Sequence, residues 1–235
     1  MSLGYLCKRL PIIAILLSLL AGCAGNPDKP FQLKTLAKSE LDLVIDIHMQ
    51  QANAEANNLM KKLYLRNPRE LRKAPPGTTL GKRQRQLFGF PRQVQFNELG
   101  KAYGAAAITL AFNPDFEGDR VFAFMAGVAG MIHASYNYQE EFFILDEIDQ
   151  QRLYNSARNL ETASWMLNSQ KDSQGNLLIL SNSTINDSIA NHSYARLFGK
   201  LIANQDTLAL IIADKNNRVI NKVVQGVAST IFLPI

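Results

Sequence analysis

The chain has 235 residues, of which 47% are hydrophobic and 9% aromatic, and its formal net charge is +5. This apolar and aromatic content excludes an intrinsically disordered or low-complexity protein. Because no Gly/Ser- or Pro-rich linker divides the chain deeply, we expect one globular domain rather than two small ones.

The first 22 residues have the pattern of an export signal. Lys8 and Arg9 precede an apolar run over residues 10–20, and Leu20-Ala21-Gly22-Cys23 follows. The run is too short to cross a bilayer, which takes about 20 apolar residues. An ordinary secretory signal or an uncleaved membrane helix would give the same apolar run, but neither predicts a cysteine at the cleavage position.

The motif Leu20-Ala21-Gly22-Cys23 resembles the lipobox of bacterial lipoproteins. The resemblance implies that residues 1–22 are a cleaved signal peptide and that Cys23 carries lipid, palmitate included, on its thiol and its new amino terminus. Several acyl chains together give stable membrane anchoring, which one chain alone does not. Ala24 stands where an aspartate commonly retains Gram-negative lipoproteins at the inner membrane. The resemblance therefore implies outer-membrane delivery, with the folded part facing the periplasm.

Residues 23–38, with Pro27 and Pro30, are predicted to form the lipidated N-terminus and a tether. Residues 39–235 are predicted to form an α-helical domain, because apolar side chains recur there at spacings of three and four. The expected helices are residues 39–66, 81–88, 98–112, 121–136 and 150–168, and one that begins near Ser193 and carries Leu197, Leu201, Leu208 and Ile212.

The segment over residues 121–136 is apolar on nearly every side, which is typical of a helix buried all round. Small residues at one-turn spacing, among them Gly127 and Gly130, would let neighbouring backbones approach closely. Sixteen residues make a helix of about 24 Å, short of the ~30 Å hydrocarbon core of a membrane. We expect this Gly/Ala-rich helix, within about 119–138, to be the centre of the fold.

The apolar run over residues 142–145 is either a short strand or an extended link, and the run over residues 177–180 is a second candidate strand that could pair with it. Residues 220–231 keep a helical period, although their β-branched content weakens that interpretation. The predicted fold class is mainly α, a single helical domain with at most one short two-stranded β element.

Charge is strongly partitioned along the chain. Residues 61–92 hold ten basic side chains against Glu70 alone, and residues 113–149 hold eight acidic side chains against Arg120 alone. The two stretches either meet in the fold or leave the basic one free for an anionic partner. For the second case the candidate contacts with anionic headgroups are Lys82, Arg83 and Arg85.

The common signatures of metal, nucleotide and hydrolase sites are missing from the sequence. Its three histidines lie far apart, and the acidic loop over residues 113–124 lacks the glutamate that an EF-hand needs at its twelfth position. We interpret His133 as a core histidine, the acids before the central helix as N-terminal caps, and the adjacent Glu140 and Glu141 as solvated side chains. No cofactor and no metal are indicated.

Three strings in the mature chain resemble a group of uncharacterised proteobacterial lipoproteins: residues 62–71 (KLYLRNPREL), 152–161 (RLYNSARNLE) and 197–203 (LFGKLIA). The likeness would cover most of the mature chain. It implies the class and the compartment but no activity, so no site residue is carried over from it.

Three functions remain open at this point. The first is a non-enzymatic scaffold or accessory of an envelope assembly, anchored in the outer membrane, with an envelope protein or anionic headgroups as partner and no role for nucleic acid. The second is a carrier of an apolar or lipid ligand held beside the central helix. The third is a cell-wall-modifying enzyme that uses Glu140, Glu141 or His133.

Overall fold

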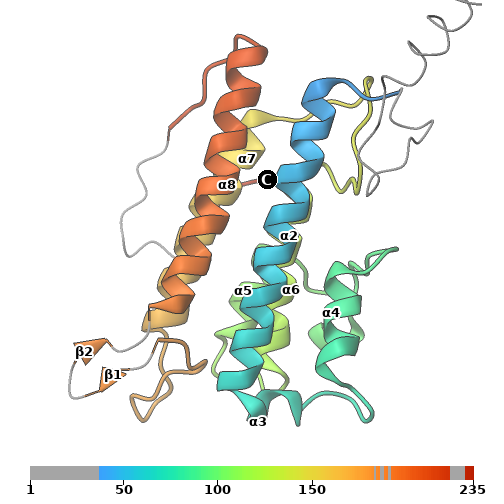
Figure 1. Cartoon of the computed structure of the whole chain (residues 1–235). Helices are drawn as coiled ribbons and strands as arrows, with labels where there is room; N and C mark the ends of the chain where they lie inside the picture. Colours follow the sequence, from blue (N-terminus) through green and yellow to red (C-terminus); the bar gives the residue numbers. More distant parts are fainter. Residues whose placement is uncertain (1–36, 183, 186–187, 190–191, 223–230) are drawn as a thin grey trace, which may run out of the picture. The chain divides into compact units, whose positions relative to one another are not determined.

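The structure is a computed structural model that describes residues 37–182, 184–185, 188–189, 192–222 and 231–235. The chain divides into two units, Met1–Ser39 and Glu40–Ile235, and every element named below belongs to the second. That unit is built mainly from helices, which confirms the predicted fold class (Figure 1).

The longer helices begin and end close to where local sequence signals predict. Thr79 and Asp149 each cap a helix, accepting hydrogen bonds from the backbone N–H groups of Lys82 at 3.2 Å and Gln151 at 2.8 Å. In chain order the helices are α2 (Glu40–Arg66), α3 (Pro68–Leu71), α4 (Leu80–Phe88), the 3-10 turn η2 (Asn97–Leu99), α5 (Ala105–Ala111), α6 (Arg120–Ser135), α7 (Gln150–Ser169) and α8 (Ser193–Lys215).

Helix α6 is the centre of the unit, as its all-round apolar sequence predicts. Each of its 16 residues is buried, and it packs against α2, α3, α4, α5 and α7. Asp119 caps its first turn by accepting a hydrogen bond from Phe122 N at 2.9 Å. The expected capping of this helix by an acid of the preceding loop is confirmed.

Two glycines of α6 bring the start of α5 into backbone contact. A Cβ atom on Gly127 would lie 2.9 Å from Gly104 O, and one on Gly130 would lie 2.8 Å from Gly104 Cα. Real Cβ atoms do not approach other heavy atoms so closely. The small residues that the sequence places one turn apart are therefore where the two helices cross.

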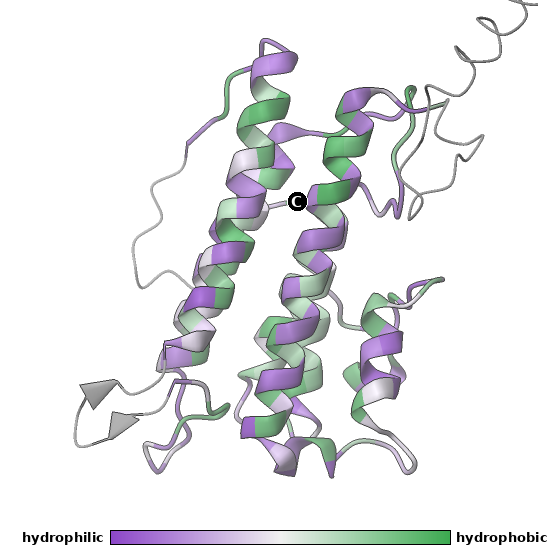
Figure 2. Ribbon diagram, viewed as in Figure 1, coloured by the Kyte–Doolittle hydropathy of each residue, from purple (hydrophilic) through white to green (hydrophobic). Residues whose placement is uncertain are grey.

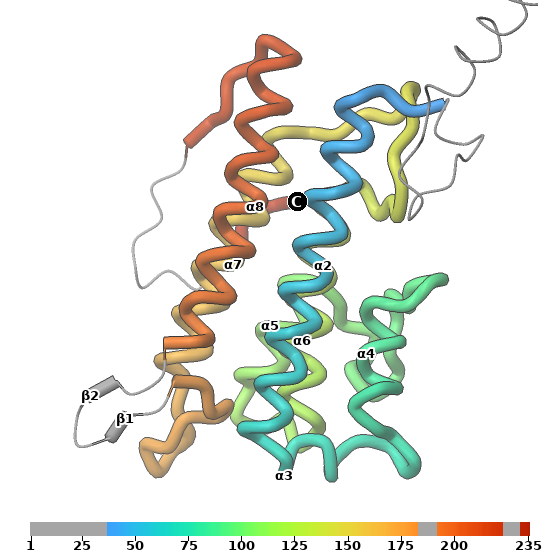
Figure 3. The backbone as a smooth tube through the Cα atoms, viewed as in Figure 1, coloured from blue at the N-terminus to red at the C-terminus, as the bar shows by residue number. Residues whose placement is uncertain are grey.

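Helices α2, α7 and α8 flank this centre. Helix α8 packs along α7 and also along α2, so segments at opposite ends of the unit's sequence lie side by side (Figure 3). Hydrophilic and hydrophobic residues share both α2 and α8 in Figure 2, as expected for helices with one buried face. The buried faces of these helices belong to one continuous core with α6.

The helix expected over residues 98–112 is wrong in its first half. The chain there makes only the turn η2 and then takes positive φ values at Gly100 (56°), Lys101 (66°) and Gly104 (60°). Left-handed residues cannot continue a right-handed helix, so α5 starts afresh at Ala105. The spacing of apolar residues in the sequence gives no sign of this interruption.

The expected pairing of residues 142–145 with residues 177–180 is also wrong. Residues 142–145 form no strand, and Leu177 pairs instead with Lys171 across the turn that starts at Asp172. The short β element lies in the following loop, where β1 (Thr184–Ile185) and β2 (Ser188–Ile189) form an antiparallel pair. The helix proposed for residues 220–231 falls mostly outside the described residues; residues 218–222 and residue 231 have no regular structure.

Candidate functional site

The basic and acidic stretches meet inside the unit, as one of the two sequence alternatives predicts. Arg92 Nε lies 2.8 Å from Glu140 Oε1, and Arg83 Nη2 lies 3.2 Å from Asp119 Oδ2. Two ion pairs between the stretches therefore join α4 and the loop after it to the two ends of α6.

Arg83 is not part of an exposed basic surface, and its prediction as a headgroup contact is wrong. The residue is 0% exposed, and its guanidinium lies 3.6 Å from the centre of the Phe122 ring. It donates hydrogen bonds of 2.6 and 2.7 Å to the two carboxylate oxygens of Glu98. A cation enclosed by these partners cannot reach a membrane surface.

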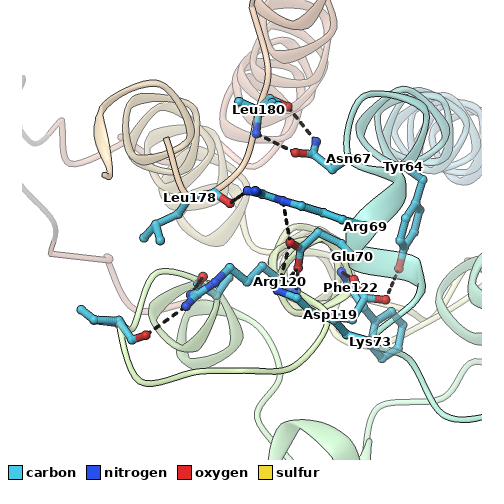
Figure 4. A network of polar contacts seen from close by, with 12 residues as sticks. Tyr64, Asn67, Arg69, Glu70, Lys73, Asp119, Arg120, Phe122, Leu178 and Leu180 are labelled. Carbon is cyan, nitrogen blue, oxygen red and sulfur yellow. Dashed lines mark hydrogen bonds and ion pairs between the residues drawn. The ribbon is translucent and has the colours of Figure 1, made fainter. Parts of the chain in front are cut away.

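Asp119 joins this cluster to the start of α6, and Figure 4 shows its contacts with Tyr64 and Phe122. Its Oδ2 accepts a 2.7 Å hydrogen bond from Tyr64 OH as well as the contact from Arg83, while Oδ1 caps the helix. Burial raises the pKa of Asp119 to about 6 in spite of these donors, and burial with the neighbouring carboxylate raises the pKa of Tyr64. The cluster is a buried structural joint that links α2, α4 and α6.

The other two members of the predicted surface, Lys82 and Arg85, are exposed on α4. Within the described part of the chain, neither makes an ion pair. Lys82 and Arg85 remain candidates for contact with an anionic partner, whereas the buried Arg83 does not.

A second polar cluster surrounds Glu70 at the end of α2 (Figure 4). This carboxylate is 0% exposed and accepts a 2.9 Å hydrogen bond from Arg120 N. Lys73 Nζ donates to both of its oxygens at 3.1 Å, and Arg69 Nε lies 3.3 Å from Oε1. Glu70 thus holds two cationic side chains against the first turn of α6.

His133 lies at the other end of α6 in a row of polar side chains. Its Nδ1 is 3.5 Å from Tyr103 OH and its Nε2 is 3.4 Å from Glu140 Oε1, whose carboxylate Arg92 binds at 2.8 and 3.2 Å. Burial and the charge of Arg92 lower the pKa of His133, while burial raises that of Tyr103 to about 12. His133 is therefore a buried, neutral imidazole at neutral pH, in line with its interpretation as a core histidine.

A hollow of about 340 Å³ opens beside this row, between α6 and the end of the chain. Gly130, Met131 and Tyr103 form one side of it, and Phe232 and Ile235 form the other. The volume is at the lower end of the range for small-molecule pockets, roughly 300–1,000 Å³. This is the position beside the central helix where a carried apolar ligand would be expected.

Two asparagines of α7 hold the C-terminal residues in place. Asn159 accepts a hydrogen bond from Leu233 N at 2.7 Å and donates one to Leu233 O at 2.9 Å. Asn155 Nδ2 donates to Pro234 O at 2.7 Å. The wall of the hollow that residues 232–235 supply is therefore fixed by hydrogen bonds to their backbone.

An apolar patch is exposed on two neighbouring segments, the start of α2 and the loop before α7. Its members are Leu43 and Ile47 on α2, and Ile144 and Leu145 on the loop before α7, with exposed fractions from 43% to 91%. Asp46 Oδ1 accepts a 2.9 Å hydrogen bond from Phe142 N, which holds this loop against α2. The two segments that carry these exposed apolar side chains are thus in contact.

Cys23, the predicted lipidation site, lies outside the described residues. Among the residues that the structure does describe, no helix is long and apolar enough to cross a membrane. In the same ranges, no three His, Cys, Asp or Glu side chains come together as metal ligands would.

The sequence reasoning missed the polar residues that face inward. Arg83 stands three residues after Leu80 and four before Leu87, so a helical phase that buries Leu87 also turns Arg83 inward. Glu70 offered a weaker signal as the only acid in the basic stretch. Nothing local marks Asn155 or Asn159, because their partner lies more than 70 residues further along the chain.

Comparison with known proteins identified no relative of this chain. No model of a known protein family matches the chain, and neither a curated protein nor a solved structure is significantly similar to it.

Proposed function

We propose that this protein is an outer-membrane lipoprotein, acylated at Cys23 and facing the periplasm, whose helical unit is a non-enzymatic scaffold of an envelope assembly. The lipobox motif Leu20-Ala21-Gly22-Cys23 supports the anchor. The observation that carries the scaffold is the apolar patch of Leu43, Ile47, Ile144 and Leu145.

The patch has the chemistry of a protein-binding surface. Ile47 is 62% exposed and Leu145 is 91% exposed, and large apolar side chains gathered on adjoining segments mark interaction sites more often than singly scattered ones do. Exposed acids, Glu40 and Glu147, stand close to it in sequence. The partner surface is therefore expected to be apolar at its centre with basic groups around it.

The proposal is tested by crosslinking in intact envelopes. A photoreactive amino acid in place of Gln50, at an exposed position of α2 next to the patch, should capture one partner protein. The double change Ile47→Ser and Leu145→Ser should abolish that product, since it removes the most exposed apolar side chain of the patch on each of the two segments.

Leu65→Ser is the matched control for this experiment. Leu65 is 71% exposed and lies on the same helix, near its other end, so its loss changes surface hydrophobicity without touching the patch. The scaffold proposal fails if the crosslinked product survives the double change, or if Leu65→Ser removes it equally.

The hollow beside α6 favours a second candidate function, that of a carrier for an apolar or lipid ligand. Filling the space should separate this from the scaffold: Ala105→Phe, at the lining of the hollow, should abolish binding of a fluorescent fatty acid to the full chain. If the wild-type protein binds no fatty acid, the carrier function is contradicted and the scaffold function is favoured.

The geometry of the His133 row supports the non-enzymatic assignment over a cell-wall enzyme. Glu140 is bound on both oxygens by Arg92, and its near neighbour is a neutral imidazole rather than a second carboxylate. Glycosidases use two carboxyl groups on either side of the scissile bond.

A further inference from the structure

A cleft of about 630 Å³ lies at the end of α2, next to the Glu70 cluster and away from the apolar patch. Helix α3, the first residue of α6 and the turn after α7 form its walls. Four cationic side chains line it, Arg69, Lys73, Arg120 and Lys171, together with the carboxylates of Glu70 and Asp172.

The cations of this cleft exceed the carboxylates by two. Glu70 is enclosed by its partners, and Asp172 Oδ1 already accepts hydrogen bonds from the backbone N–H groups of Gln174 at 2.9 Å and Asn176 at 2.8 Å. Those bonds lower the pKa of Asp172, so it stays ionised and occupied by its own turn. Four positive charges within one concave surface repel one another and focus a positive potential into it.

Contacts within the fold hold at least three of the cations in position before any ligand arrives. The Arg120 guanidinium donates to the carbonyl oxygens of Ala111, Asn113 and Pro114, at 2.7, 2.8 and 3.1 Å, and none of these partners carries a charge. Glu70 fixes Lys73, and Arg69 reaches across to Leu178 O at 3.4 Å. Such preorganisation lowers the entropy that binding an anion would otherwise require.

Lys171 lines the cleft from the turn after α7, whereas Arg69 lines it from α3, and Lys171 is exposed. Across the described ranges of the chain it forms no ion pair, so its ammonium group is available to a ligand in the cleft. Arginine and lysine are the usual recognition groups for phosphate oxygens.

We propose that this cleft binds a phosphate ester, with the phosphate between Arg69 and Lys171 and the organic part in the remaining space. A phosphate monoester carries close to two negative charges at neutral pH, which matches the excess of two positive charges among the residues that line the cleft. The volume is well within the range of pockets that hold a whole small molecule, so it exceeds what a bare anion needs. The proposal concerns a site separate from the patch and from Cys23, and it does not rest on the proposed function.

The test is calorimetric titration of the full chain in a non-ionic detergent. Glycerophosphate is the soluble probe, and dihexanoyl phosphatidic acid presents the same group as a lipid headgroup. We expect binding of glycerophosphate and none of glycerol. Binding of both phosphate probes would show that the site accepts headgroups, and binding of glycerophosphate alone would show a soluble ligand; either outcome supports the site.

Two double variants decide whether the cleft is responsible. Arg69→Gln with Lys171→Gln removes two exposed charges from the cleft, and Lys82→Gln with Arg85→Gln removes two from α4. Each charge-assisted contact is worth about tenfold in affinity, so the first pair should weaken binding by roughly 100-fold and the second by less than about twofold. Lys171→Gln alone should weaken binding by about tenfold, and it leaves the Glu70 cluster intact.

The proposal is overturned if wild-type protein binds neither phosphate probe. It is overturned equally if both double variants lose the same affinity, because the attraction would then be a property of overall charge. An unchanged thermal midpoint of Lys171→Gln keeps a folding defect from being mistaken for a lost contact.

Discussion

Arg83 and its two basic neighbours on α4 show how differently three similar side chains can act. Arg83 is enclosed by Glu98, Asp119 and the Phe122 ring, whereas Lys82 and Arg85 are exposed to solvent. Removing one partner of a buried ion pair leaves the other charge uncompensated in a poorly polarisable environment. The effect of losing a charge therefore depends on burial and not on residue type.

Arg83→Gln should lower the free energy of unfolding by about 3–5 kcal/mol, because Asp119 and Glu98 lose their buried cation. Lys82→Gln and Arg85→Gln should each change it by less than about 0.5 kcal/mol, as is usual for exposed positions. Urea unfolding followed by circular dichroism measures all three. Equal effects at the three positions would contradict the enclosed placement of Arg83.

Asp119 should make stability fall as pH rises. Its pKa is about 6 in the folded protein, raised by burial, against an ordinary value of 3.8 in the unfolded chain. Between these values the folded state keeps the proton that the unfolded state has lost, so stability declines by at most about 1.4 kcal/mol per pH unit. Below pH 3.8 and above about 6 the two states bind the same number of protons at this group, and its contribution is constant.

The comparison of wild type with Asp119→Asn isolates this contribution, since asparagine still caps the helix but does not titrate. The difference in unfolding free energy between them should shift in favour of the variant from about pH 4 to about pH 6. Asp115→Asn, at an exposed position of the same loop, controls for the loss of one negative charge. A difference that stays constant over this interval would mean that Asp119 is ionised throughout.

At the level of elements, the contact between α5 and α6 depends on having no side chain at Gly127 and Gly130. The nearest atoms to a Cβ at Gly130 belong to the backbone of Gly104, which itself has a positive φ and begins α5. Backbone atoms cannot move aside as the end of a flexible side chain can. The position of α5 thus depends on the absence of Cβ atoms at these two glycines of α6.

Gly130→Ala should destabilise the protein by about 1–3 kcal/mol through overpacking against Gly104. Gly199→Ala is the matched control, because Gly199 also lies within a helix, α8, but a Cβ there meets nothing within 4 Å. Alanine is the better helix former, so this second change should stabilise by up to about 1 kcal/mol. Thermal unfolding of the two variants should shift in opposite directions, and two shifts of the same sign would contradict the close approach.

At the level of the whole molecule, the proposed anchor at Cys23 and the folded unit belong to different parts of the sequence. The proposed lipid site precedes the described residues, and the apolar patch lies on the first turns of α2 and the loop beside it. The proposed scaffold needs both: the lipid would restrict the protein to a membrane, and the patch would select the partner.

Cys23→Ala should abolish labelling by radioactive palmitate and release the protein from sedimented membranes, because the thiol that forms the thioether is gone. The chain's other cysteine, Cys7, is the natural control: it lies in the predicted signal peptide, so Cys7→Ala should keep both the label and the sedimentation. A Cys23→Ala protein that is still labelled and still sediments would remove the basis of the proposed location.

The amino-acid sequence by itself determined the helical class, the buried central helix and most helix boundaries. Those features depend on interactions within a few residues, such as the apolar period of residues 121–136 and the capping by Thr79 and Asp149. A local pattern of this kind can be read without knowing what lies next to it in space.

Only the tertiary structure decided which charged and polar groups pair with one another inside the fold and which are accessible to a ligand or partner. Arg83 meets Asp119 across 36 positions of sequence, Asn159 holds Leu233 across 74, and the cleft combines cations from α3, α6 and the turn after α7. The free energy of a charge depends on its burial and on the sign of its neighbours, and both are set by contacts between segments that no local pattern relates.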